Sequence, residues 1–388
     1  MITNSQALRD FCAPLHDEPF VTVDTEFMRE KTYWPQLCLV QVGGPEEAVA
    51  IDPLADGMDL TPLFDLFDNQ NVTKVFHAAR QDLEIFLHIA DRLPVPVFDT
   101  QVAAMVCGFG ESVGYEQLVA KLANARLDKG SRFTDWAARP LSERQITYAL
   151  ADVTHLRVAY KKLRDRLERE NRTAWIEEEM QILRAPATYR PDPAEVYQRI
   201  KGRKGHGKFL AVLRELAAWR EEEAQRRDVP RNRVLRDETL VEIAHHTPEK
   251  PDALSRTRGL GDKAAHGPMG SAVLAAVKRG LAVPKAEWPV APSRPDLPRG
   301  IGPIADLLKV LLKKVAEETN VAGRLIASSA DVDLIAGLGE AADVAALRGW
   351  RREIFGADAL KLQAGDLALS IDGNRLVVRD LPTLQAAD

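Results

Sequence analysis

The sequence contains few cysteines, and their spacing fits neither a zinc site nor a disulfide framework. Cys12, Cys38 and Cys107 are widely separated and odd in number. The sequence has no run of about eighteen apolar residues, the length that a membrane-spanning helix needs. Its first residues also lack the basic start and apolar stretch of an export signal. We therefore expect a protein of the reducing cytoplasm that makes no contact with a membrane.

The sequence also lacks a surplus of positive charge. It has 52 Lys and Arg against 57 Asp and Glu, a net charge of -5, which argues against a protein that coats nucleic acid with its whole surface. A local basic surface would still suffice for an enzyme that acts on nucleic acid. No complete G-x-x-x-x-G-K-[ST] phosphate loop occurs. The remaining composition is that of an ordinary globular protein, and 388 residues are too many for one core, so we expect two or three domains.

The first part of the chain alternates short β-rich runs with helical patterns, as an α/β domain does. We expect the first three strands, which lie close together with turn residues between them, to form an antiparallel meander. The expected strands span residues 20–27, 37–42, 48–51, 73–77 and 95–98. The expected helices span residues 83–89, 101–106, 115–122 and 142–169, and the last has Ser142 and Gln145 at the spacing of a capping box.

Proline-rich stretches divide the rest of the chain. One lies at residues 185–193 and another at 284–303, and helical patterns fill the segments after each. The helical patterns span residues 209–227, 238–245 and 271–281, then 304–319, 322–327, 330–337 and 345–355. We therefore predict three domains, at residues 1–185, 205–285 and 300–380, of which the last two are small and all-α.

Two acidic residues share one face of the first expected strand. Side chains two positions apart on a strand point the same way, so Asp24 and Glu26 project together while Val23 and Thr25 project oppositely. Two carboxylates near a buried sheet repel each other, and a hard divalent cation would neutralise them. An isolated D-x-E pattern is more often a strand whose acids face solvent, so the motif alone does not identify a site.

Two later segments carry further candidate groups, each with a structural alternative. Asp82 falls in the first turn of an expected helix, where it would also stabilise the helix dipole without any ligand. Tyr148 and Asp152 are four residues apart and so share one helical face, as they would on any amphipathic helix. His77 ends a strand and is interpreted as hydrogen-bonded scaffold rather than as a metal ligand.

The order and context of these segments resemble the ribonuclease D family, within the DEDD exonuclease superfamily. The resemblance covers roughly residues 20–156. It is carried by Asp24 and Glu26 in V-D-T-E-F, Asp82 in H-A-A-R-Q-D-L-E-I-F, and Tyr148 with Asp152 in Y-A-L-A-D-V. It implies an α/β ribonuclease H-like exonuclease domain, with a mixed sheet flanked by helices, followed by two small all-α HRDC-like domains.

Two further details refine the resemblance. A histidine subclass would carry its general base five residues before the last aspartate, where this sequence has Thr147, so Tyr148 indicates the tyrosine subclass. The segments R-N-R-V-L-R-D at 231–237 and R-G-L-G at 258–261 are similar to an HRDC domain, a helical nucleic-acid-binding module. The C-terminal helical segment looks like a second, more diverged copy.

The resemblance implies a metal-dependent 3′→5′ exoribonuclease with Asp24, Glu26, Asp82, Tyr148 and Asp152 as catalytic residues. The four acids would bind two Mg²⁺ or Mn²⁺ ions, which suit an all-oxygen site better than zinc does. Our hypothesis is that Asp24, Glu26 and Asp152 hold one ion, which would lower the pKa of a bound water. Asp24 would bridge to a second ion that Asp82 helps to hold, and this ion would stabilise the leaving 3′ oxygen. Tyr148 would orient the attacking water.

The expected partner is RNA with a single-stranded 3′ end, since the scissile nucleotide must be splayed into a carboxylate pocket. The resemblance implies trimming of tRNA precursors and other structured RNAs, with a nucleoside 5′-monophosphate as product, by a monomer. Two alternatives stay open. One is a 3′→5′ DNA exonuclease with the same acids, and the other is a catalytically silent RNA-binding or scaffold protein.

Overall fold

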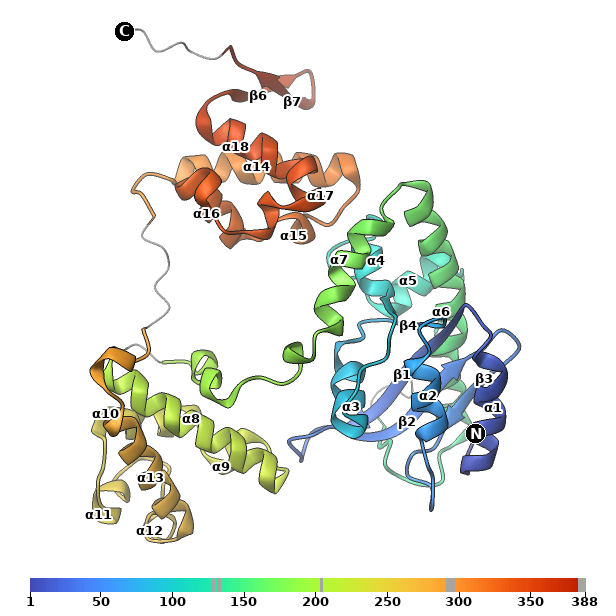
Figure 1. Cartoon of the computed structure of the whole chain (residues 1–388). Helices are drawn as coiled ribbons and strands as arrows, with labels where there is room; N and C mark the ends of the chain where they lie inside the picture. Colours follow the sequence, from blue (N-terminus) through green and yellow to red (C-terminus); the bar gives the residue numbers. More distant parts are fainter. Residues whose placement is uncertain (128–129, 131–133, 203–204, 291–296, 383–388) are drawn as a thin grey trace, which may run out of the picture.

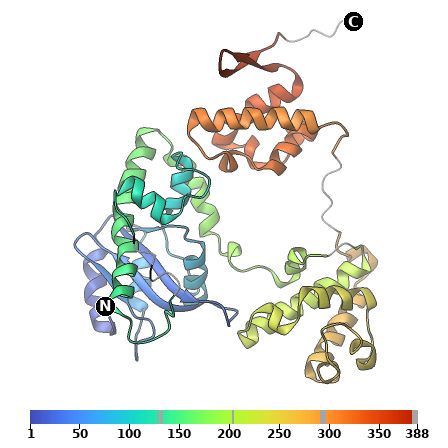
Figure 2. The same cartoon turned by 180° about the vertical axis from the view of Figure 1, so that it is seen from behind.

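The computed structural model describes residues 1–127, 130, 134–202, 205–290 and 297–382. Its three largest hydrophobic cores are built from successive parts of the chain, which gives an N-terminal α/β unit and two smaller, mainly helical units (Figures 1 and 2). No helix within these described ranges combines the length and the apolar character needed to cross a bilayer.

A five-stranded mixed sheet forms the centre of the α/β unit. Its strand order is β3-β2-β1-β4-β5. The strand β1 pairs antiparallel with β2, which pairs antiparallel with β3, and it pairs parallel with β4 on its other side. The antiparallel meander is therefore confirmed, and each strand lies within two residues of its expected bounds. The strands are β1 (Phe20–Met28), β2 (Gln36–Gly43), β3 (Ala48–Ile51), β4 (Thr73–Phe76) and β5 (Val97–Asp99).

Helices cover both faces of this sheet. Val21 and Val23 of β1 pack in the main core with apolar residues of α1, α2 and α3. On the other face α6 crosses β1, β2 and β3, and Thr22 donates a hydrogen bond to the Val153 carbonyl at 2.8 Å. The helices of this unit are α1 (Ser5–Leu15), α2 (Thr61–Asp68), α3 (Arg80–Ala90), α4 (Thr100–Val106), α5 (Tyr115–Leu122), α6 (Glu143–Arg169) and α7 (Thr173–Arg184). The helices α1, α2 and α7 were not predicted from the sequence.

The first helical unit is built around the long helix α8, which packs against α13 and α10 (Figure 1). Its elements are the 3₁₀ helix Pro193–Arg199, α8 (Lys208–Arg227), α9 (Arg231–Val234), α10 (Asp237–His246), α11 (Pro251–Leu254), α12 (Asp262–Ala265) and α13 (Pro268–Ala282).

The loop between β1 and β2 reaches this unit. The backbone N–H groups of Tyr33 and Trp34 both donate to the Asp228 carboxylate at 3.0 Å, and the Tyr33 hydroxyl donates to the buried Glu221. The Arg231 guanidinium lies over the Tyr33 ring, 4.8 Å from its centroid. Polar contacts therefore attach the first helical unit to the sheet.

The prediction that the C-terminal unit is all-α was wrong. Its last two elements form an antiparallel hairpin of β6 and β7, whose Leu369 and Val378 pack against the helical core. The predicted helix over 345–355 is also interrupted, because a 3₁₀ turn at Ala345–Leu347 and a π-helical turn at Arg352–Gly356 flank the short α17. The elements are α14 (Gly302–Thr319), α15 (Gly323–Ile326), α16 (Ser329–Leu338), α17 (Gly349–Arg351), α18 (Ala357–Ala364), β6 (Leu367–Asp372) and β7 (Arg375–Asp380).

Two local features fix the start of α6, the helix that carries Tyr148 and Asp152. The predicted capping box is present, since the Ser142 side chain accepts from the Gln145 backbone and the Gln145 side chain accepts from the Ser142 N–H. Just before it, Arg139 forms a bidentate pair with the buried Asp52, with N–O distances of 2.7 and 2.6 Å. Burial favours a raised pKa for Asp52, but the hydrogen bonds from Arg139 hold that pKa below its usual value.

We predict that Asp52→Asn lowers stability by about 1–3 kcal/mol, because it leaves the partly buried Arg139 without its counter-charge. A pKa held low in the folded state gives stability above the unfolded-state pKa and loses it as pH falls. The loss caused by the substitution should therefore be full at pH 7 and shrink toward pH 3, as measured by urea unfolding. The exposed Asp56 supplies the control Asp56→Asn, and equal stability of the two variants at pH 7 would contradict this role of the ion pair.

Candidate active site

Three acidic side chains from two elements converge between β1 and α6. The two-residue period of β1 places Asp24 and Glu26 on the face covered by α6, and α6 contributes Asp152. Each offers an oxygen, and the three oxygens lie within 4.8 Å of one another. The structure thus brings together three of the four acids that the sequence singled out.

Asp82 lies close by but outside this group of three. It is buried in the first turn of α3, and its carboxylate accepts a hydrogen bond from the Thr25 hydroxyl. Thr25 projects from the face of β1 opposite to Asp24 and Glu26, so this hydrogen bond holds Asp82 beside β1. Burial and the charge of Asp24 raise the pKa of Asp82 well above its usual value. The two carboxylates are therefore near enough to repel each other.

The same two effects act on the acids of β1. Burial, and to a smaller extent the charge of Asp152, raises the pKa of Asp24 well above its usual range. Burial, together with the charges of Asp24, Asp152 and Asp82, raises the pKa of Glu26 to about 9. Among the described residues no Lys, Arg or His forms an ion pair with Asp24, Glu26 or Asp82. A set of buried oxygen donors that repel one another fits a hard divalent cation such as Mg²⁺ or Mn²⁺.

A buried aspartate that the sequence analysis did not single out determines where α3 begins. The Asp99 carboxylate accepts from the backbone N–H groups of Ala78 and Ala79 at 2.9 and 2.8 Å, and from that of Gln101 at 2.8 Å. Ala78 has a left-handed backbone, with φ of 61°, which is uncommon for a residue with a side chain. Asp99 thus holds the turn that leads into Asp82 and caps α4 as well. An aspartate directly before a helical pattern was the available signal.

A cavity of about 450 Å³ opens beside the carboxylates. Asp24, Tyr148 and Asp152 line it together with His77 and Tyr115. Tyr148 and Asp152 therefore share this cavity as well as one helical face. The His77 ring nitrogen Nδ1 lies 3.0 Å from the Thr100 hydroxyl, and His77 lies outside the group of three acids.

Tyr115 is a second residue that the sequence analysis missed. Its hydroxyl donates to the backbone carbonyls of Ala151, at 3.2 Å, and Asp152. Burial and the charges of Asp152 and Asp24 raise its pKa, so the hydroxyl stays protonated and remains a donor. Tyr115 therefore supports the turn of α6 that carries Asp152. No pattern around position 115 indicates this contact, which exists only once α5 packs on α6.

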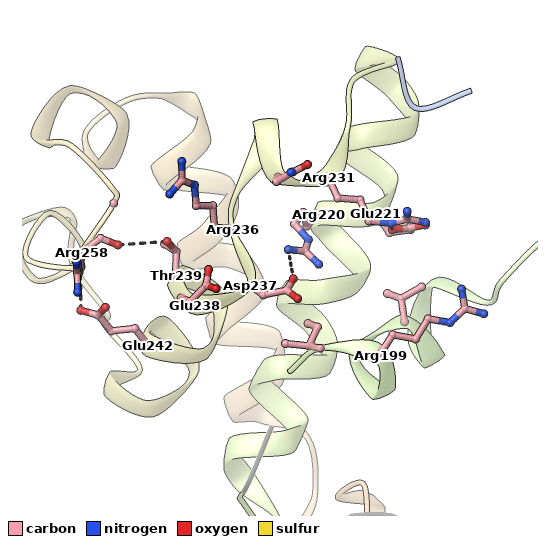
Figure 3. A pocket seen from close by; sticks show the side chains of 14 residues that line it. Arg199, Arg220, Glu221, Arg231, Arg236, Asp237, Glu238, Thr239, Glu242 and Arg258 are labelled. Atoms are coloured by element: carbon pink, nitrogen blue, oxygen red, sulfur yellow. Dashed lines mark hydrogen bonds and ion pairs between the residues drawn. The ribbon is translucent and has the colours of Figure 1, made fainter. Parts of the chain in front are cut away.

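Another cleft, of about 830 Å³, lies on the first helical unit and contains none of these acids (Figure 3). Five arginines and four carboxylates line it. Arg220 pairs with Asp237 at 2.7 Å, and Arg231 pairs with Glu221. Its charges are therefore nearly balanced.

We predict that Glu26→Gln stabilises the metal-free protein at pH 8, raising Tm by about 2–4 °C for each 1 kcal/mol of relieved repulsion. A carboxyl group whose pKa is raised by folding removes stability as the pH rises from its unfolded-state pKa toward its folded-state pKa. For Glu26 this window runs from 4.5 to about 9. Thermal unfolding at pH 5 and pH 8 in the presence of EDTA tests this, with the exposed Glu30→Gln as control. A Tm gain that is equal at both pH values would refute the electrostatic explanation.

The chain is similar in sequence to known 3′-5′ exonucleases. A family model described as a 3′-5′ exonuclease matches residues 1–168, and an HRDC domain model matches residues 209–277. Ribonuclease D of Gluconacetobacter diazotrophicus is 51% identical, over 97% of this chain and 95% of that protein. Ribonuclease D of Acidiphilium cryptum is also 51% identical, over 98% of this chain and 97% of that protein.

A solved structure shares the fold over most of the chain. RNase D of Escherichia coli, described as an exoribonuclease involved in structured RNA processing, superimposes with a TM-score of 0.81. It is 31% identical, and the match covers 94% of this chain and 98% of that one. Both the relatives and this structure extend over almost the full sequence. The chain therefore belongs to the ribonuclease D family of 3′→5′ exoribonucleases.

Proposed function

We propose that this exoribonuclease uses two divalent metal ions, Mg²⁺ or Mn²⁺, held by Asp24, Glu26, Asp82 and Asp152. The observation that carries the proposal is the convergence of three carboxylates within 4.8 Å, with the pKa of Glu26 raised to about 9 by burial and by its acidic neighbours. Such a group stays ionised at neutral pH only if a cation neutralises it. Metal dependence and the carboxylate cluster are thus two aspects of one electrostatic requirement.

The residues of the site divide the work between binding and orientation. Asp24, Glu26 and Asp152 would hold one ion, and Asp24 would also reach a second ion that Asp82 helps to hold. Bound ions of this kind supply Lewis acidity, which activates water and stabilises charge on a leaving 3′ oxygen. Tyr148, one helical turn before Asp152 and in the same cavity, orients the attacking water with its hydroxyl. Its ring lies 6.1 Å from that of Trp136, which limits its motion.

The proposed substrate is RNA with a single-stranded 3′ end, and the product is a nucleoside 5′-monophosphate. A cavity of about 450 Å³ accepts one splayed nucleotide rather than a duplex. The described role of the Escherichia coli relative in structured RNA processing supports tRNA precursors and other structured RNAs as targets.

We assign residues 1–185 to catalysis and residues 205–285 and 300–380 to two RNA-holding domains, the second of them a diverged HRDC-like domain. We further propose that the protein works as a monomer in the cytoplasm.

We predict that Asp24→Asn lowers kcat by at least about a thousandfold, or about 4 kcal/mol of transition-state stabilisation. The substitution removes one metal ligand and one of the four negative charges of the cluster, while the fold keeps its shape. Release of labelled 5′-mononucleotide from a 3′-tailed RNA measures the loss. The affinity for RNA should stay within about twofold of the wild type, because basic side chains rather than Asp24 contact the phosphates. The exposed Asp17→Asn is the control. Turnover retained by Asp24→Asn would remove Asp24 from the mechanism.

We also predict that the enzyme degrades a 3′-tailed RNA in Mg²⁺ or Mn²⁺, that EDTA stops the reaction, and that the DNA strand of the same sequence is cleaved more slowly. Side-by-side digestion with and without chelator separates the candidate functions. Faster cleavage of DNA would favour a DNA exonuclease. Cleavage of neither strand, together with RNA binding, would favour a silent RNA-binding protein.

A further inference from the structure

The C-terminal unit is docked firmly onto the α/β unit. Trp350 stacks on Trp175 of α7, with ring centroids 4.5 Å apart and an interplanar angle of 10°. The buried Arg351 pairs with Glu178 at 3.0 Å and also with Glu179. These contacts hold the two units together, and the C-terminal unit lies beside α4 and α7 (Figure 1).

A second group of contacts joins the α14–α15 turn to the end of α4 and to the residue before α7. The Ala322 N–H donates to the Met105 carbonyl at 2.9 Å, and Arg172 donates to the Thr319 carbonyl at 2.6 Å. Gly108, with φ of +75°, lies so close to Asn320 that a β-carbon there would come within 2.6 Å of the Asn320 carbonyl oxygen. The C-terminal unit therefore contacts the loop at residues 107–114, which connects α4 to α5.

A cleft of about 490 Å³ lies where this loop meets the C-terminal unit, and we name it the junction cleft. Its charged lining residues are Lys309, Lys313, Arg324 and Glu111. Lys309 pairs with Asp306 at 3.1 Å, whereas Lys313 and Arg324 have no ion-pair partner among the described residues. Positive charge therefore predominates in this cleft, unlike the nearly balanced cleft of the first helical unit (Figure 3).

Other groups in the junction cleft also suit a nucleic-acid strand. Ser328 and Ser329 supply hydroxyl donors, and Leu312 and Ala316 supply an apolar surface. Phosphate oxygens accept from cations and hydroxyls, while sugars and bases pack on apolar groups. The cleft thus offers a partner for each part of a nucleotide.

The junction cleft is connected to the active-site cavity by a single loop. Glu111 lines the junction cleft, and the next residue, Ser112, lines the cavity that contains Asp24, Tyr148 and Asp152. The two hollows thus lie on either side of one short segment. We expect a strand whose 3′ end occupies the cavity to pass over this segment into the junction cleft.

We propose that the junction cleft binds the sugar-phosphate backbone of single-stranded RNA immediately 5′ of the nucleotide being removed, through Lys313 and Arg324. This inference rests on the proposed function, which supplies the 3′ end in the cavity. It locates the RNA-binding role proposed above for residues 300–380 at one cleft and two cations, outside the part of the chain that the HRDC model matches. The docking contacts keep this surface at a fixed position relative to the carboxylates.

The test compares the full-length double variant Lys313→Gln/Arg324→Gln with the wild type, using an unstructured oligoadenylate and an adenylyl dinucleotide. Binding of the oligoadenylate is measured in an Asp24→Asn background to prevent its degradation. We expect Kd to rise about tenfold and the slope of log Kd against log salt to fall by about 1.4, from about 0.7 for each lost phosphate contact. The ratio of kcat/KM on the oligoadenylate to that on the dinucleotide should also fall about tenfold.

Two further variants serve as controls, one that removes the negative charge of the cleft and one that removes positive charge elsewhere. Glu111→Gln removes the acid of the junction cleft and should tighten binding of the oligoadenylate by about threefold. Arg375→Gln/Arg379→Gln removes two positive charges from the hairpin of β6 and β7 and should leave Kd within twofold of the wild type. Thermal unfolding of every variant verifies that the fold is intact.

The outcomes separate this proposal from the proposed function. The junction-cleft proposal is overturned if Lys313→Gln/Arg324→Gln binds the oligoadenylate with the same affinity and salt slope as Arg375→Gln/Arg379→Gln. An equal loss of kcat/KM on the oligoadenylate and the dinucleotide overturns it as well, because the cleft would then not bind the part of the RNA that lies 5′ of the removed nucleotide. If the wild type releases no mononucleotide from either substrate, the proposed function fails instead.

Discussion

Repulsion among carboxylates held close together is the constraint around which this molecule is built. Asp24 and Glu26 lie on one strand face, Asp152 approaches from α6, and Asp82 stands beside them. A chain free to relax would separate such charges. The site therefore requires a scaffold rigid enough to keep the charges together until cations arrive.

The scaffold supplies that rigidity through hydrogen bonds to the segments that carry the acids. Thr25 and Asp99 act on Asp82, the first by direct contact and the second by fixing the turn before α3. Tyr115 supports the turn of α6 at Asp152. The Arg139–Asp52 pair anchors the chain just before that helix. Thr25 and Tyr115 are neutral donors, Asp99 accepts from backbone N–H groups, and Arg139 already has Asp52 as its counter-charge. None of these groups therefore brings a positive charge to the carboxylates. The scaffold holds the acids in place while leaving their charge available.

The sequence alone predicted much of this arrangement, for identifiable reasons. The period of two along β1 placed Asp24 and Glu26 on one face, and the helical period placed Tyr148 one turn from Asp152. Both relations are local and follow from backbone geometry. That β1 and α6 meet came only from the resemblance to a known family. The roles of Asp99 and Tyr115 were not predictable, because their contacts connect elements that are distant in the chain. The hairpin of β6 and β7 had a usable signal, a Gly-Asn turn between alternating segments, but the surrounding helical pattern obscured it.

The account depends on metal ions occupying the space between these carboxylates, and anomalous diffraction from crystals soaked in Mn²⁺ tests this most directly. We predict two neighbouring anomalous peaks, one in contact with Glu26 and Asp152 and the other with Asp82, and both in contact with Asp24. Asp24→Asn crystals soaked in the same way should lose at least one peak. Wild-type crystals with no peak at the carboxylates, while Mn²⁺ still supports RNA cleavage in solution, would contradict the account.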